Sequence, residues 1–339
     1  MRTAVRVVPV ALATLLVLAG CAGVGAPKGT PSPTPTRAVP AEPASAFAFH
    51  LAPLTGQLVA ATEAIGPSLA AKIDNHPDAR PQWALNQTDL VFEELVEGGL
   101  TRYVAVWQSR IPSDIGPVRS IRPMDPDIIS PLGGIVAYSG GQAQFVSMMR
   151  AAPVVNVSAD AGDAAFYRVK GRVAPHNELL KAADVVREHA DIPAPPALFQ
   201  FGSVAVVAQQ AGTPATRIDL AFSSGSKRSW EWDAATASWL RAQSGVPDSS
   251  FDEGRVRASN VIVLRVAIDW RYGIVPKTVM VDSGEALVAI DGRVIRGTWS
   301  KASQTAPIVL RDAAGAVITL RTGNSWIELV PRSGSLTAG

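Results

Sequence analysis

The chain has 339 residues, of which 47% are hydrophobic, and it contains one cysteine, 31 basic and 29 acidic side chains. This apolar fraction excludes a chain that is disordered throughout. The lack of any run of about 18 apolar residues excludes a polytopic membrane protein. A single cysteine excludes an intramolecular disulfide and a multi-cysteine metal site. A length near twice that of an average domain predicts two domains.

The charge balance of the chain argues against a nucleic-acid partner. Arg2 and Arg6 lie in the first twenty residues, which contain no acidic side chain, so the rest of the chain carries 29 basic and 29 acidic groups. A protein that binds nucleic acids without sequence preference needs a strong positive excess on one face. We therefore do not expect nucleic acid among the partners of this protein.

The N-terminus has the pattern of a secretory signal peptide. Arg2 and Arg6 precede an apolar stretch over residues 7–18, which is too short to cross a bilayer but suits the core of a signal peptide. The stretch ends in Leu18-Ala19-Gly20-Cys21, which resembles the bacterial lipobox. In that motif the cysteine receives lipid and becomes the first residue of the mature protein. The pattern predicts a signal peptide over residues 1–20 and acyl chains, such as palmitate, on Cys21 that anchor the protein to the extracytoplasmic face of the cell membrane.

A tether is predicted directly after the lipidated cysteine. Residues 21–50 contain six prolines among small and polar residues. Such a composition cannot bury a core and forms an extended, disordered linker. We expect this linker to hold the folded part of the protein away from the membrane.

Strand and helix patterns alternate in the first half of the folded part. We expect strands at 69–74 and 135–138, and a hairpin of strands 90–96 and 100–108 around Gly98-Gly99. Helices are expected at 142–150 and at 177–190, the second with Asn177 as its N-cap. Interleaved elements of this kind predict a mixed α/β domain over residues 51–205.

The second half has short strand patterns separated by turn residues. No helical period is evident after Gly202. The expected strands are 230–232, 237–241, 260–268, 277–281, 286–290, 293–299, 307–311, 317–321 and 326–330. These patterns predict an all-β domain over residues 206–331, either a sandwich or a partly open barrel, followed by a tail at 332–339. The fold class predicted for the whole chain is α+β.

Six of the eight tryptophans lie in this second half, at positions 230, 232, 239, 270, 299 and 326. Aromatic side chains on a β surface bind sugars, and a cell envelope supplies glycans. The alternative is that these tryptophans form the core of a β domain, which we favour.

Ordered strings of residues in both halves resemble the DUF3048 (YerB-like) lipoprotein family. They include Ile73-Asp-Asn-His76, Phe92-Glu-Glu-Leu-Val-Glu-Gly-Gly99, Gly116-Pro-Val-Arg-Ser120, Ala289-Ile-Asp-Gly-Arg-Val-Ile-Arg-Gly-Thr-Trp-Ser300 and Trp326-Ile-Glu-Leu-Val-Pro331. The resemblance covers almost all of the mature chain. It implies a two-domain lipoprotein of the bacterial envelope and implies no particular activity.

One set of residues in the first half has the chemistry of a metal site. Asp74 follows a predicted strand, Glu93 and Glu94 lie in the first strand of the hairpin with side chains on opposite faces, and His176 precedes a predicted helix. Asp74, one of the glutamates and His176 would hold a hard cation that activates water, with Asp74 and His176 as catalytic candidates. The spacing matches no named metal motif.

A second set has the chemistry of an anion site. Arg119 and Arg122 lie in a loop flanked by Gly and Pro, and Arg102 lies in the hairpin. Arginines bind phosphate and carboxylate groups through paired hydrogen bonds. The alternative for Arg119 and Arg122 is an ion pair between the two domains, and the alternative for Arg102 is a cross-strand pair with Glu94 in the hairpin. His76 lines the same site or only closes a turn before Pro77.

Together these features predict an envelope lipoprotein that acts by binding an anionic envelope component, a glycan or a partner protein. The alternative is a metal-dependent hydrolase that uses Asp74, Glu93 or Glu94 and His176, with Arg119 and Arg122 holding the anionic substrate.

Overall fold

The structure is a computed structural model that describes residues 49–61, 65–251 and 253–339. These residues belong to one compact unit. The predicted signal peptide, Cys21 and nearly all of the predicted tether lie outside the described residues. The first described strand, β1 (Phe49–Leu51), pairs with β2 (Leu58–Ala60), so the last two residues of the expected tether lie in a strand.

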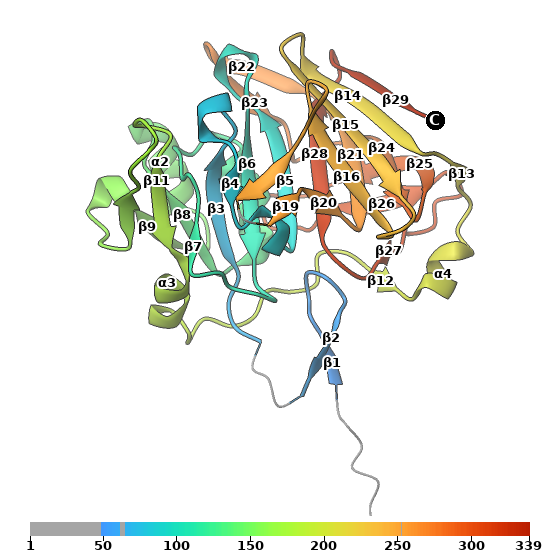
Figure 1. Cartoon of the computed structure of the whole chain (residues 1–339), viewed down its shortest axis with the longest axis horizontal. Helices are drawn as coiled ribbons and strands as arrows, with labels where there is room; N and C mark the ends of the chain where they lie inside the picture. The colour runs from blue at the N-terminus through green and yellow to red at the C-terminus, as the bar shows by residue number, and fades with distance from the viewer. Residues whose placement is uncertain (1–48, 62–64, 252) are drawn as a thin grey trace, which may run out of the picture. The chain divides into compact units, whose positions relative to one another are not determined.

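The core of the fold is one large sheet of eleven strands (Figure 1). In spatial order its strands are β13 (Thr213–Pro214), β25 (Arg293–Ser300), β24 (Ser283–Ile290), β21 (Asn260–Val266), β28 (Ser325–Pro331), β5 (Leu90–Leu95), β6 (Thr101–Trp107), β3 (Leu69–Asp74), β8 (Ile135–Tyr138) and β9 (Val155–Ser158), with β26 (Val309–Asp312) paired to β25. The expected strand 69–74 and the expected hairpin are confirmed. Most of the expected strands of the second half are also present.

The two halves of the sequence meet inside this sheet. Strand β28 from the second half runs parallel to β5 from the first half, with Ser325 opposite Leu90 and Glu328 opposite Glu93. Backbone hydrogen bonds therefore continue from one half into the other. The fold is mostly β with several sheets, consistent with the α+β class, whereas the division into two domains near residue 205 is not confirmed.

Successive side chains of the large sheet point to its two opposite faces. Each face is covered by other elements and contributes to a hydrophobic core. Helices α1 (Asp125–Ile129) and α2 (Ala143–Arg150) and the hairpin of β22 (Ile268–Tyr272) and β23 (Val275–Thr278) contribute to the core on one face. On the other face the core includes residues of helix α3 (Ala182–Glu188) and of a six-stranded sheet. That sheet consists of β17 (Val246–Pro247), β16 (Ser238–Gln243), β15 (Ser226–Asp233), β14 (Arg217–Ser223) and β29 (Ser335–Ala338), with β20 (Arg257–Ala258) paired to β16.

Smaller sheets complete the described structure. They are β10 (Phe166–Arg168) with β11 (Glu178–Lys181) and β7 (Asp114–Ile115), β19 (Gly254–Arg255) with β18 (Ser249–Phe251) and β4 (Gln82–Trp83), and β12 (Phe201–Gly202) with β27 (Leu320–Arg321). Among the helices of the described residues, none has the length and apolar composition that a membrane span requires.

The expected helix at 177–190 is wrong in its first part. Residues Glu178–Lys181 form strand β11, and only Ala182–Glu188 are helical. Strand β11 pairs on both sides, with β10 and with β7, and it buries Leu179 and Leu180 in succession. Tertiary pairing thus overrides the helical period of the sequence. Asn177 is not a helix cap, because its amide donates to the carbonyls of Val169 and Arg172.

Two expectations for the second half are also wrong. A short helix, α4 (Val204–Ala208), follows Ser203, whose hydroxyl accepts a hydrogen bond from the Val206 amide. Five residues are too few to reveal a helical period in the sequence. The expected tail contains β29, which pairs antiparallel with β14.

The tryptophans mostly form core, as favoured above. Trp230, Trp239, Trp299 and Trp326 are buried, whereas Trp270 is 56% exposed. The rings of Trp230 and Trp326 contact each other edge to face across the interface between the two sheets.

Candidate functional site

The end of strand β3 brings three of the sequence-predicted residues together. Asp74 is the last residue of β3 and is 3% exposed. Its Oδ2 atom lies 2.7 Å from His176 Nδ1 and 3.2 Å from Arg119 Nε. Its Oδ1 atom accepts a hydrogen bond of 3.0 Å from the backbone N–H of His76. Asp74 therefore joins the loop after β3 to two segments that are distant in the sequence.

Two histidines stack beside this carboxylate. The rings of His76 and His176 are 4.4 Å apart and nearly parallel. His76 Nδ1 also accepts from the backbone N–H of Asp78, so His76 closes the turn before Pro77 as the alternative interpretation expected. Asp78 Oδ2 lies 3.5 Å from the same Nδ1 atom. One ligand atom from each of His76, Asp78 and His176 lies within 4.8 Å of the other two, a spacing that suits a metal ion.

The three predicted arginines also converge, and we call Arg102, Arg119 and Arg122 the arginine cluster. Arg102 and Arg122 each donate from Nη1 to the carbonyl oxygen of Ser120, at 2.8 and 3.3 Å. Arg119 directly precedes that residue. Burial, together with the positive charges of Arg122 and Arg119, lowers the pKa of Arg102 to about 10.

Carboxylates neutralise only part of the arginine cluster. Arg122 Nε donates to Glu97 Oε2 at 2.8 Å. Burial alone would raise the pKa of Glu97, but this hydrogen bond contributes to a net decrease. Among the described residues, Arg102 has no carboxylate within 4.0 Å, and the side chain of Arg119 makes only its ion pair with Asp74. A guanidinium carries five N–H donors, so several donors around Ser120 have no acceptor within the described residues.

Glu94, a predicted metal ligand, lies on the same face of the large sheet as Arg102, but its carboxylate is bonded to Lys72. Glu94 and Asp125 both accept from Nζ of Lys72, which is 1% exposed. Burial lowers the pKa of Lys72 to about 8, although Asp125 opposes the decrease. Glu94 lies opposite Arg102 in the hairpin register, as expected, but its ion pair is with Lys72.

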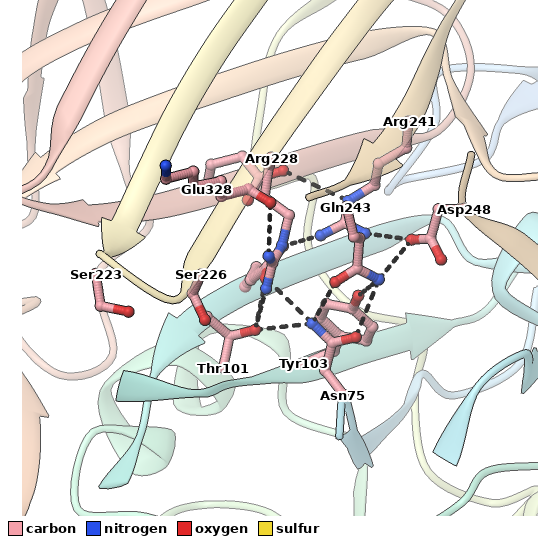
Figure 2. Close-up of polar contacts among 12 residues, drawn as sticks. Asn75, Thr101, Tyr103, Ser223, Ser226, Arg228, Arg241, Gln243, Asp248 and Glu328 are labelled. Carbon is pink, nitrogen blue, oxygen red and sulfur yellow. Dashed lines mark hydrogen bonds and ion pairs between the residues drawn. The ribbon is translucent and has the colours of Figure 1, made fainter. Parts of the chain in front are cut away.

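Glu93, the other predicted glutamate, points to the opposite face. It belongs to a buried group of Glu93, Arg228, Arg241, Asp248 and Glu328, which we call the Glu93 cluster. Figure 2 labels the other four members of this cluster. Arg228 donates to Glu93 at 2.8 Å, and Arg241 pairs with both Glu93 and Asp248. Neither glutamate therefore joins Asp74 and His176 in one ligand set, because each already binds a buried cation.

Protonation of Glu328 completes the Glu93 cluster. Glu328 is fully buried, and it accepts a hydrogen bond of 2.8 Å from Trp230 Nε1. Burial and the nearby charge of Glu93 raise the pKa of Glu328 to about 8. When Glu328 is protonated, the two positive charges of Arg228 and Arg241 are balanced by the two negative charges of Glu93 and Asp248.

Several residues of these sites were not predicted. Lys72 is the one basic residue of the otherwise apolar β3 pattern before Asp74, and that isolation is a signal that could have identified it. Asp78 is exposed and follows a proline, so its type and position indicate only a turn. Arg228 and Arg241 lie in alternating β patterns, and only the packing of the two sheets brings them to Glu93.

Two models of one protein family together match most of the folded part of this chain. The family model described as "Protein of unknown function (DUF3048) N-terminal domain" matches residues 54–192, and the corresponding C-terminal domain model matches residues 218–327. A relative from Bacillus subtilis (strain 168) named "Putative lipoprotein YerB" is 25% identical over 295 residues, which are 83% of this chain and 86% of the relative. The crystal structure of the YerB protein from the same organism is similar with a TM-score of 0.73 and 23% identity, over 85% of this chain and 99% of that one. This similarity of structure establishes a shared fold.

Proposed function

Because this chain belongs to the DUF3048 family, we propose that it is a lipid-anchored protein of the cell envelope whose folded part binds an anionic ligand at the arginine cluster. The lipobox at Leu18-Ala19-Gly20-Cys21 supports the anchor. The name of the Bacillus subtilis relative, a lipoprotein, agrees with it.

The observation that carries the proposed binding function is the set of unused guanidinium donors around Ser120. Arg102 is 8% exposed, and its side chain makes one hydrogen bond with the described residues, to a carbonyl oxygen that Arg122 shares. A buried charge without a partner is costly. A phosphate or carboxylate carries several acceptor oxygens, so one such group would accept from more than one of these arginines.

The metal-dependent hydrolase receives less support. Its predicted ligand set required Glu93 or Glu94 beside Asp74 and His176. Glu94 binds Lys72, and Glu93 binds Arg228 and Arg241 on the other face of the sheet. Withdrawing either glutamate would leave a buried cation without its counter-ion, which is strongly unfavourable. Binding therefore explains the arrangement of side chains better than this hydrolysis scheme.

Titration calorimetry with inorganic phosphate and with glycerol 3-phosphate tests the binding proposal. The mature chain from Cys21, kept in detergent, should bind one of these anions. Arg119→Met and Arg122→Met should each weaken binding by about tenfold to a hundredfold, because a charge-assisted hydrogen bond contributes about 1.5–3 kcal/mol. Arg217→Met is the matched control, since Arg217 pairs with Asp219 on the exposed surface of the six-stranded sheet. Equal affinities in all variants, or no binding at millimolar concentrations, would contradict the proposal.

Cell fractionation tests the anchor. The wild-type chain should remain with the membrane fraction and incorporate labelled palmitate. Cys21→Ser should incorporate none and should leave the membrane fraction, because no other cysteine can accept the lipid. Labelling of the Cys21→Ser chain would show that the anchor lies elsewhere.

A further inference from the structure

The geometry points to a transition-metal site on the loop after β3: we propose that His76, Asp78 and His176 bind a zinc ion. This site lies beside the arginine cluster but does not depend on the proposed anion binding. It also differs from the metal site predicted from the sequence. Asp74 is not a ligand here but positions His176, and Glu93 and Glu94 take no part.

The spacing of the ligand atoms suits a tetrahedral ion. His76 Nδ1 and Asp78 Oδ2 are 3.5 Å apart. Two ligands of a tetrahedral zinc ion, each at about 2.0–2.1 Å from the metal, are separated by roughly 3.3 Å. The third ligand atom, from His176, lies within 4.8 Å of the other two. Zinc binding would require the stacked ring of His76 to turn toward His176 and the exposed Asp78, and it would replace the hydrogen bond from the Asp78 N–H to His76 Nδ1.

Asp74 orients His176 for metal binding. His176 Nδ1 lies 2.7 Å from Asp74 Oδ2, and in the neutral tautomer that donates from Nδ1 to this carboxylate, Nε2 carries the lone pair and points away from Asp74. Such a carboxylate–histidine pair is the usual support of a zinc-binding imidazole. Asp74 also accepts the backbone N–H of His76, so one buried carboxylate positions both histidines. Asp74 is thus a positioning residue and not a ligand.

The chemistry of the ligand set selects the class of ion. Imidazole nitrogens favour zinc, copper and nickel over magnesium or calcium, which prefer oxygen ligands. Three protein ligands leave the fourth position of a tetrahedral ion open to water or to an added ligand. Arg119 pairs with the same Asp74 that holds His176, so the metal site and the arginine cluster share one positioning residue.

Zinc titration of the full mature chain, free of any affinity tag and dialysed against a chelator, tests the site. Calorimetry should detect one zinc ion per chain with a dissociation constant in the micromolar range or below. His76→Ala and His176→Ala should each weaken binding at least tenfold, and Asp74→Asn should weaken it about 10–100-fold through the loss of orientation. His189→Ala, at the end of α3, is the matched control and should bind like the wild type. Substitution of cobalt should produce the strong visible absorption of a tetrahedral ion.

A further variant separates loss of the site from loss of the fold. Asp78 has a side chain that is 72% exposed, so Asp78→Asn should leave the thermal unfolding curve unchanged while it weakens zinc binding. Wild-type zinc affinity in Asp78→Asn and in the two histidine variants would overturn the proposal, as would zinc binding by the wild type no tighter than millimolar. Arg122→Met should lose phosphate affinity and keep zinc affinity, so the metal site and the anion site can fail separately.

Discussion

The two polar clusters of this protein lie on opposite faces of the same sheet, and they use the same residue types in different ways. In the Glu93 cluster two arginines are buried, and each is bonded to a carboxylate. In the arginine cluster the side chains of Arg119 and Arg122 remain 20% and 12% exposed, and Arg102 has no carboxylate partner within the described residues. Residue type alone therefore does not distinguish a structural arginine from a ligand-binding one.

The difference lies in how completely the donors are used. Arg228 donates from all three of its nitrogens, to Glu93, to the Lys227 carbonyl and to Thr101. The side chain of Arg119 makes no hydrogen bond with the described residues. Nε of Arg241 has no hydrogen bond with the described residues, but its other two nitrogens pair with Glu93 and Asp248. Such bonds stabilise the packing of the two sheets, whereas the unused donors of Arg119, whose side chain is 20% exposed, remain available to a ligand. We therefore expect arginine substitutions in the Glu93 cluster to lower the stability of the fold, and those in the arginine cluster to weaken ligand binding with little effect on stability.

The largest effect is expected in the Glu93 cluster. Arg241→Met would leave Glu93 and Asp248 buried with one cation fewer, and removing one partner of a buried ion pair costs about 3–5 kcal/mol. Urea unfolding should report a loss of stability of this size. Arg217→Met, which breaks only exposed pairs, should cost less than about 1 kcal/mol. Similar losses for the two variants would show that the buried cluster does not stabilise the fold.

A pH-dependent effect is expected from Glu328. Its pKa rises from the usual 4.5 to about 8 in the folded state, so its contribution to stability is complete below pH 4.5 and is lost as the pH rises to about 8. Glu328→Gln keeps a neutral side chain at every pH. The melting temperature of the variant, relative to that of the wild type, should therefore increase between pH 5 and pH 9. A difference that is constant over this range would contradict protonation of Glu328 in the folded protein.

The smallest effect on stability is expected in the arginine cluster. Arg102→Met removes one hydrogen bond to the Ser120 carbonyl, but it also removes a desolvated cation that has no counter-ion among the described residues. The free energy of unfolding should change by no more than about 1 kcal/mol. A loss as large as that of Arg241→Met would mean that Arg102 is a structural residue.

Local sequence patterns predicted the elements whose contacts are mostly local. The hairpin of β5 and β6 is specified by two β-rich runs around Gly98-Gly99, and α2 by its composition. Strand β11 was mistaken for helix because its leucines fit a helical period, and only its pairing with β10 and β7 identifies it as a strand.

The candidate site was predictable in part for the same reason. Asp74, His176 and Arg119 were singled out by residue type and by their places next to predicted elements, and the structure brings them into contact. The roles of Glu93 and Glu94 could not be assigned, because both lie in one strand and only their distant partners distinguish them.

Residue order alone specifies the secretory and lipobox pattern at the N-terminus, the family resemblance, the alternation of Glu93 and Glu94 across one strand, and most of the strands. These features depend on local order along the chain. The pairing of β28 with β5, the neutralisation of Glu93 by Arg228 and Arg241, and the stacking of His76 on His176 depend instead on how the chain packs in three dimensions. Such contacts join residues that are a hundred or more positions apart, and no local pattern specifies which distant residue satisfies a buried charge.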